Sequence, residues 1–151
     1  MNRQGKKHHT QWAGQFGVAH ELAKRGYLMA FTLGNAPGTD LICESPKETS
    51  FSLEVKTLSS KTYYICQDHL LKPKASRHFV FVLLPSSHLE RPEYYVLNNK
   101  QFLEVAEEQK QITKASEIKR GKSYADFSFG INYKTLARKD FRDEWEKNLP
   151  E

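Results

Sequence analysis

The apolar run HFVFVLL at residues 78–84 constrains the fold more than any other stretch of the sequence. It is far shorter than the roughly 20 residues that span a bilayer. A continuous apolar run of this length is typical of a strand covered on both faces, and Pro85 ends it. The chain therefore needs a sheet with cover on either side, and its 151 residues are enough for one domain with one sizeable core.

The segments around this strand predict a mixed sheet flanked by helices. Helical periodicity at residues 10–25 places Trp12, Phe16 and Leu22 on one apolar face. A later helix starts near residue 100, and Phe141 and Trp145 are spaced to face the core from a C-terminal helix. Further strands are expected at residues 27–33, 40–43, 50–58 and 93–98.

These elements indicate a single α/β or α+β domain over residues 1–151, with about five central strands, a basic N-terminal arm at 1–10 and a C-terminal helix at 138–149. With no secretory signal and no apolar run of membrane-spanning length, we expect a cytoplasmic, nucleoid-associated protein rather than a secreted one. Cys43 and Cys66 are expected to be buried reduced thiols. Loops typical of NTPases, dehydrogenases and serine hydrolases are absent from the sequence.

Positive charge is concentrated in two segments of the chain. The net charge is +5, and both residues 1–10 and residues 110–122 are rich in lysine and arginine. Such segments can pair with nucleic-acid phosphates. An ordinary solvated surface explains the charge equally well.

Alternation along residues 50–58 places Glu54 and Lys56 on the same face of a strand. The opposite face, with Phe51, Leu53 and Val55, is apolar enough to be core. Asp40 begins the preceding strand, and a short connection could bring its carboxylate alongside.

Two carboxylates at one point are hard oxygen ligands for Mg²⁺, and a neighbouring lysine can orient a water or stabilise charge on a phosphate. A glutamate and a lysine two positions apart are also common as a solvated pair on a sheet surface. The pattern alone favours the solvated pair.

The segment nevertheless resembles the PD-(D/E)XK nuclease superfamily, which has the restriction-endonuclease-like fold. Asp40, a gap of thirteen residues (41 through 53) and then Glu54-Val55-Lys56 follow its signature. The helix GQFGVAHELAKRGY and the following LGNAPGTDLI are similar to the first helix and strands of its small nucleases. The resemblance covers residues 10–60. It departs from the signature in one respect, because Pro37 is separated from Asp40 by two residues.

The resemblance implies a metal-dependent DNA endonuclease that hydrolyses phosphodiester bonds, of a site-specific homing or restriction type. Asp40 and Glu54, with the Val55 carbonyl, would hold Mg²⁺, for which Mn²⁺ is expected to substitute. Lys56 would assist the attacking water or the transition state. A helix residue completes such sites, and we expect Gln15 there rather than Glu21, which lies beside Lys24 and Arg25 as a solvated pair.

The expected partners are double-stranded DNA and further copies of the chain, in a homodimer or homotetramer. The expected DNA contacts are Lys6, Lys7, Ser59, Ser60, Lys61, Lys119, Arg120 and Lys122. Two alternatives remain: a structure-selective nuclease similar to Holliday-junction resolvases, and a catalytically inactive DNA-binding module of the same fold.

Overall fold

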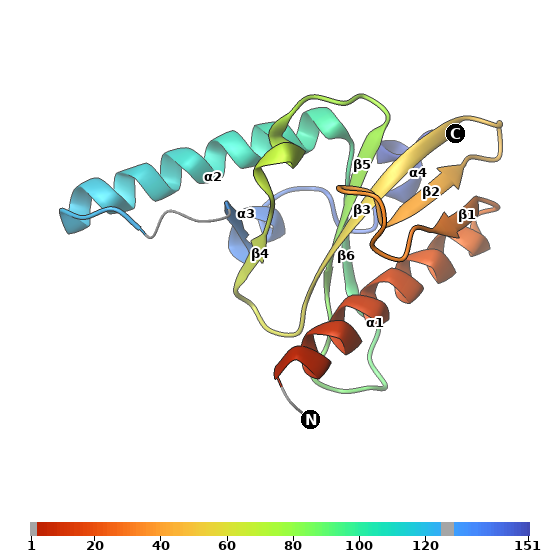
Figure 1. Cartoon of the computed structure of the whole chain (residues 1–151), viewed down its shortest axis with the longest axis horizontal. Coiled ribbons are helices and arrows are strands. Elements are labelled where there is room, and N and C mark those ends of the chain that lie inside the picture. The colour runs from red at the N-terminus through yellow and green to blue at the C-terminus, as the bar shows by residue number, and fades with distance from the viewer. Residues whose placement is uncertain (1–2, 125–128) are drawn as a thin grey trace.

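The computed structural model describes residues 3–124 and 129–151, which form a mixed α+β fold. Its centre is a five-stranded sheet in the order β1-β2-β3-β5-β6 (Figure 1). β3 and β5 are parallel, and the other neighbours are antiparallel. The bounds are β1 Leu28–Phe31, β2 Leu41–Glu44, β3 Ser50–Leu58, β5 Arg77–Leu83 and β6 Glu93–Leu97. The prediction of a mixed central sheet of about five strands is confirmed.

The strand expected to be covered on both faces is β5, and all seven of its residues are buried. Val80 and Val82 point into one core cluster, whereas Phe79 and Phe81 point into a second cluster on the other side of the sheet. Both clusters are needed because a β-strand directs alternate side chains to opposite faces.

Different elements cover the two faces of the sheet. α1 (Arg3–Lys24) and α4 (Trp145–Asn148) pack on the face of Val80 and Val82. The other face is covered by α2 (Asn99–Arg120), α3 (Tyr133–Ala137), the 3₁₀ turn η1 (Asp68–Leu71) and the small sheet of β4 (Tyr63–Ile65) with β7 (Gly130–Asn132). Among the described residues, no helix has both the length and the hydropathy that a membrane span requires.

The basic N-terminal segment is part of a helix instead of a separate arm. α1 begins at Arg3, seven residues before the predicted start, and the Thr10 hydroxyl donates to the Lys6 carbonyl within the helix. Residues 1–2 lie outside the described part of the chain.

The second long helix begins at Asn99, close to the predicted start. α2 starts with a capping box between Asn98 and Gln101 and continues through most of the basic segment to Arg120. Gly121 then ends it in the left-handed conformation, with a φ of 70°.

The prediction of a C-terminal helix over residues 138–149 is wrong. Only Trp145–Asn148 are helical, and Asp143 has a left-handed φ of 58°. The backbone N–H of Asp143 donates to the Tyr94 carbonyl, so this segment pairs with β6 instead of with itself. Consequently Phe141 and Trp145 pack into different core clusters, not side by side on one helix.

The predicted apolar face of the first helix is confirmed for Leu22, which is fully buried in the core, and wrong for its other two residues. Trp12 and Phe16 are 54% and 61% exposed. α1 approaches the sheet through glycines instead: a Cβ at Gly14 would lie 1.8 Å from Thr57 Oγ1, and one at Gly17 would lie 2.5 Å from the Tyr94 hydroxyl. This close approach is what allows a polar residue of α1 to reach the sheet.

Candidate active site

The candidate site lies where β2 and β3 separate. The last pair in their register is Leu41 with Leu53, so Asp40 and Glu54 stand opposite each other one residue further along. There the backbone N–H of Val55 donates to Asp40 Oδ2 at 2.8 Å. The carboxylate oxygen thus takes the place of the backbone carbonyl that would accept this hydrogen bond in a continuing strand pair. The Asp40 carboxylate therefore fills the gap that the departing strand leaves.

Asp40 is held in an unfavourable setting for a negative charge. Burial raises its pKa, the charge of Glu54 raises it further, and together they bring it from 3.8 to about 6. The hydrogen bond from the Val55 N–H and the charge of Lys56 lower the pKa of Asp40, but by less than burial and Glu54 raise it. The two carboxylates are thus close enough to repel each other.

Glu54 and Lys56 project from one face of β3, as alternation predicted. Lys56 Nζ lies 2.7 Å from Glu54 Oε1, but only 5% of Glu54 is exposed. The interpretation of these two residues as a solvated surface pair is therefore wrong. The Cys66 thiol lies near both groups, and burial raises its pKa to about 12, so it is a neutral neighbour. Cys43 and Cys66 are both buried free thiols.

Gln15 reaches the same point from the other face of the sheet. Its Nε2 donates to Asp40 Oδ1 at 2.9 Å, and the side chain is buried. Of the two helix residues considered in the sequence, the structure brings Gln15 to Asp40, whereas Glu21 lies elsewhere.

Glu21 is not the solvated residue that the sequence indicated. It is 4% exposed, and it pairs with Lys24, Arg25 and Arg91 at 3.1, 2.8 and 3.4 Å. Burial would raise its pKa, but the hydrogen bonds from Arg25 and Lys24 and the charge of Arg91 lower it to about 2. Through its ion pair with Arg91, Glu21 therefore joins α1 to the loop before β6.

The donor atoms of this site suit Mg²⁺. No group of three or more His, Cys, Asp or Glu side chains that could hold a metal is found in the described residues. Mg²⁺, however, retains several waters and typically binds through one or two carboxylates and a substrate phosphate. Asp40 and Glu54 offer that number, and a cation between them would offset the repulsion that raises the pKa of Asp40.

The Val55 carbonyl fits as a further oxygen ligand. In a strand, the N–H and C=O of one residue point to the same edge. The Val55 N–H points to Asp40, so its carbonyl also faces the edge that β2 has left.

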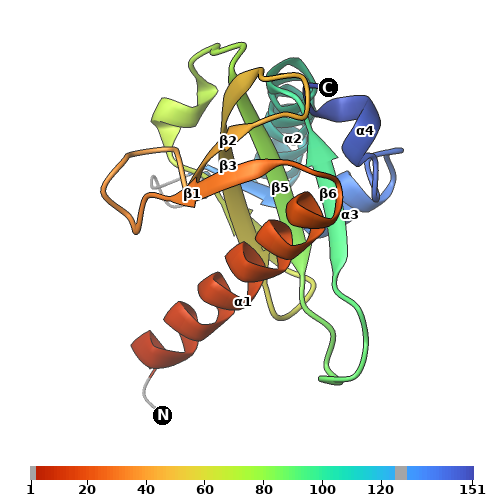
Figure 2. The same cartoon turned by 90° about the vertical axis from the view of Figure 1, so that its right-hand side faces the viewer.

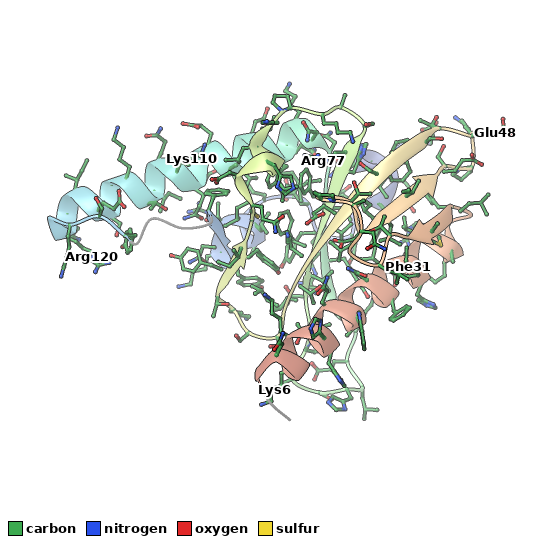
Figure 3. All side chains as sticks on the ribbon, viewed as in Figure 1. Lys6, Phe31, Glu48, Arg77, Lys110 and Arg120 are labelled. Atoms are coloured by element: carbon green, nitrogen blue, oxygen red, sulfur yellow. The ribbon has the colours of Figure 1, made fainter. Side chains whose placement is uncertain are left out.

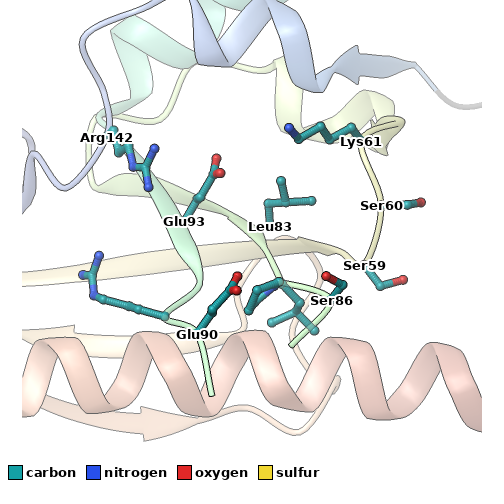
Figure 4. Close-up of a pocket in the computed structure, with 11 residues that line it drawn as sticks. Ser59, Ser60, Lys61, Leu83, Ser86, Glu90, Glu93 and Arg142 are labelled. Carbon is teal, nitrogen blue, oxygen red and sulfur yellow. The ribbon is translucent and has the colours of Figure 1, made fainter. Parts of the chain in front are cut away.

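The serines and lysine expected to contact DNA follow directly after β3. Ser59, Ser60 and Lys61 are exposed and line a cavity of about 420 Å³ at the ends of β3 and β5. Figure 4 shows Lys61 and Arg142 on opposite sides of this cavity, with Glu93 between them. The lining contains acidic as well as basic side chains, so its charge does not favour DNA in particular. Contact of these residues with DNA stays a prediction.

The two basic segments are far apart in the fold. Figure 3 shows Lys6 near the start of α1 and Arg120 at the distant end of α2. Lys7, Lys119 and Lys122 are also exposed, each at the end of one of these helices. The structure thus provides two separate basic surfaces and does not bring Lys119, Arg120 or Lys122 to the carboxylates.

Two features near the site were missed in the sequence. The first is the pair Gly14 and Gly17, whose position inside a helical pattern signals a close packing contact. The second is Arg77, which lies on the same face of the sheet as Glu54 and is 8% exposed. Its Nε and Nη1 have no hydrogen-bond partner in the described part of the chain. The sequence did contain a signal for this residue, because Arg77 directly precedes the apolar run at residues 78–84.

No protein-family model, curated protein or solved structure matches this chain. The function is therefore inferred from the site's own geometry and chemistry.

Proposed function

We propose that this protein is a metal-dependent endonuclease that hydrolyses phosphodiester bonds in DNA. The observation that carries the proposal is the meeting of Asp40, Glu54 and Lys56 where β2 leaves β3, with Gln15 bonded to Asp40. The resemblance of the sequence to the PD-(D/E)XK nucleases agrees with this arrangement.

Each side chain has a distinct role in this proposal. Asp40 and Glu54, together with the Val55 carbonyl, hold Mg²⁺. When bound, the cation lowers the pKa of a water and neutralises charge that develops on the phosphate. Lys56, steadied by Glu54 at 2.7 Å, donates a hydrogen bond to the attacking water or to a phosphate oxygen. Gln15 keeps Asp40 oriented from α1.

DNA is the substrate that the charge of the chain favours. The net charge of +5 and the exposed lysines at the start of α1 suit a polyanion. One site cuts one strand, so double-strand cleavage needs two copies of the chain.

The test incubates the protein with supercoiled, linear and four-way-branched DNA, with Mg²⁺, with Mn²⁺ and with EDTA. We expect cleavage of at least one substrate with either metal and none with EDTA. Preference for branched over linear DNA would assign the resolvase-like type, whereas discrete linear fragments would assign the site-specific type. If DNA is bound but never cut, the chain is a DNA-binding module and the proposal fails.

The mechanism is tested by Lys56→Ala. Removing the ammonium should slow cleavage by about 100-fold or more and leave DNA binding intact. Lys100→Ala is the matched control, because Lys100 is an exposed lysine on α2 with 87% of its side chain accessible. If Lys56→Ala cuts as fast as this control, the role of Lys56 is wrong.

A further inference from the structure

β1 is a four-residue edge strand that carries no charged residue, no proline and no bulge. It pairs with β2 on one side, and no described strand pairs with its other side. Natural sheets guard such edges with charged residues, proline, bulges or short strands, and of these four β1 has only its short length. β1 has the sequence LMAF, and residues 26–38 contain no Asp, Glu, Lys, Arg or His, although 27% of the chain is Asp, Glu, Lys or Arg.

Large apolar side chains flank this edge on both faces of the sheet. On the α1 side, Trp12 and Phe16 are more than half exposed, and the Phe16 ring lies 5.2 Å from that of Phe31 on β1. On the other side, Leu28 and Ile42 are 67% and 57% exposed. Figure 2 shows β1 beside α1 at the rim of the sheet.

The exposed area is close to what a stable dimer buries. A fully exposed aromatic side chain presents about 150–250 Å². At their exposed fractions, Trp12, Phe16, Leu28, Ile42 and the 83% exposed Leu33 together present roughly 500–700 Å². A standard interface buries about 800 Å² on each partner, and the free backbone edge of β1 adds to the total.

We infer that this surface, the β1 edge with Trp12, Phe16, Leu28, Leu33 and Ile42, joins two copies of the chain in a twofold homodimer. Antiparallel pairing of β1 with β1 of a second copy is symmetric, so each copy presents the same patch. The pairing satisfies the free backbone groups of both edges. A patch without charge meets itself without repulsion, as the charge-depleted centre of an interface requires.

The inference stands on the surface alone and is independent of the endonuclease proposal. Its test is therefore sedimentation equilibrium without nucleic acid or divalent metal. We expect the wild-type chain to have twice its 17.5-kDa mass at about 50 μM protein. Phe16→Glu should raise the dissociation constant at least tenfold, because it places a carboxylate against an apolar surface in each copy.

Leu89→Glu is the matched control. Leu89 is 98% exposed in the loop between β5 and β6, so the same charge is added to an exposed apolar side chain outside the patch. Its dissociation constant should equal that of the wild type. A monomeric wild type, or a Phe16→Glu variant that associates as tightly as Leu89→Glu, would overturn the inference.

Hydrogen exchange identifies the paired edge directly. Backbone amides of residues 28–31 should exchange at least tenfold more slowly at 50 μM than at a concentration where the chain is monomeric. The amides of β6, at the opposite edge of the sheet, serve as the internal reference. Slowing at β6 and not at β1 would place the interface on the wrong edge and refute the inference.

Discussion

Replacing Asp40 by Asn should remove a pH-dependent destabilisation from the protein. In the wild type the pKa of Asp40 is raised from 3.8 to about 6, first by burial and then by Glu54. The folded state therefore binds a proton more tightly than the unfolded state does. The stability from this group is fully present below pH 4 and is lost as pH rises through 6.

The size of the effect follows from the two pKa values. One pKa unit corresponds to about 1.4 kcal/mol, so the change from 3.8 to about 6 corresponds to about 3 kcal/mol. Asp40 is partly exposed, so this figure is an upper bound. Asparagine keeps the shape of the side chain, and the Gln15 amide can rotate to accept a hydrogen bond from it. Any cost of that exchange is independent of pH.

The assay is urea unfolding of both proteins in EDTA between pH 4 and pH 7.5. The stability of Asp40→Asn minus that of the wild type should rise by about 2–3 kcal/mol across this range. Glu21 does not disturb the comparison. Its pKa is lowered from 4.5 to about 2, so its contribution to the free energy of unfolding is lost only as the pH falls below 4.5. Both proteins contain Glu21, so this contribution also cancels in the difference. A difference that stays flat would show that Asp40 does not titrate near pH 6 and that the carboxylates are not coupled.

Mg²⁺ provides an independent check on the same residue. At pH 7, Mg²⁺ at ten times its dissociation constant should stabilise the wild type by about 1.4 kcal/mol. It should have little effect on Asp40→Asn, which lacks one of the two carboxylates. Equal stabilisation of both proteins would mean that the metal binds elsewhere.

Two further substitutions test the packing around the site. Gly14→Ala should lower the free energy of unfolding by about 1–3 kcal/mol, because its Cβ would lie 1.8 Å from Thr57 Oγ1 and α1 must move. An unchanged urea midpoint would contradict this close contact. Arg77→Met should instead raise the free energy of unfolding by about 1–3 kcal/mol, because the buried Nε and Nη1 have no partner within the described chain. A lower thermal midpoint for Arg77→Met would show that the guanidinium has a stabilising role.

The central sheet and the positions of Glu54 and Lys56 could be predicted because they depend on strand periodicity. A buried strand must be apolar throughout, and alternation alone assigns residues 50–58 to two faces. The juxtaposition of Asp40 with Glu54 follows from a short antiparallel connection, which the sequence also shows.

The C-terminal segment could not be predicted because tertiary contacts outweigh its helical pattern. Residues 138–149 have helical spacing. However, the backbone N–H of Asp143 donates to the Tyr94 carbonyl, and the backbone of Arg142 forms an isolated antiparallel β-bridge with Tyr95. These contacts join the segment to a strand more than 40 residues earlier, which local periodicity does not register.

α1 was correctly predicted as a helix, but the burial of its side chains follows hydrophobicity only in part: Leu22 is buried as expected, whereas four other residues are not where their polarity indicates. Gln15 and Glu21 are buried, whereas Trp12 and Phe16 are exposed. Gly14 brings the helix so near the sheet that a polar residue beside it must find a polar partner, and Gln15 finds Asp40. The inner face of α1 is thus shaped by the candidate site.

The outer face of α1 then needs its own explanation. Two aromatic residues exposed beside an uncharged strand edge are costly in a monomer, because they leave apolar area in water. A second copy of the chain would remove that cost and make Trp12 and Phe16 interfacial core residues. The helical periodicity would then be correct for all three residues of the predicted face, with Leu22 buried in the chain's own core and the two aromatic residues buried in the dimer. Phe16→Glu should therefore weaken association and leave the free energy of unfolding of the monomer nearly unchanged. Gly14→Ala should lower the free energy of unfolding of the monomer and leave association nearly unchanged.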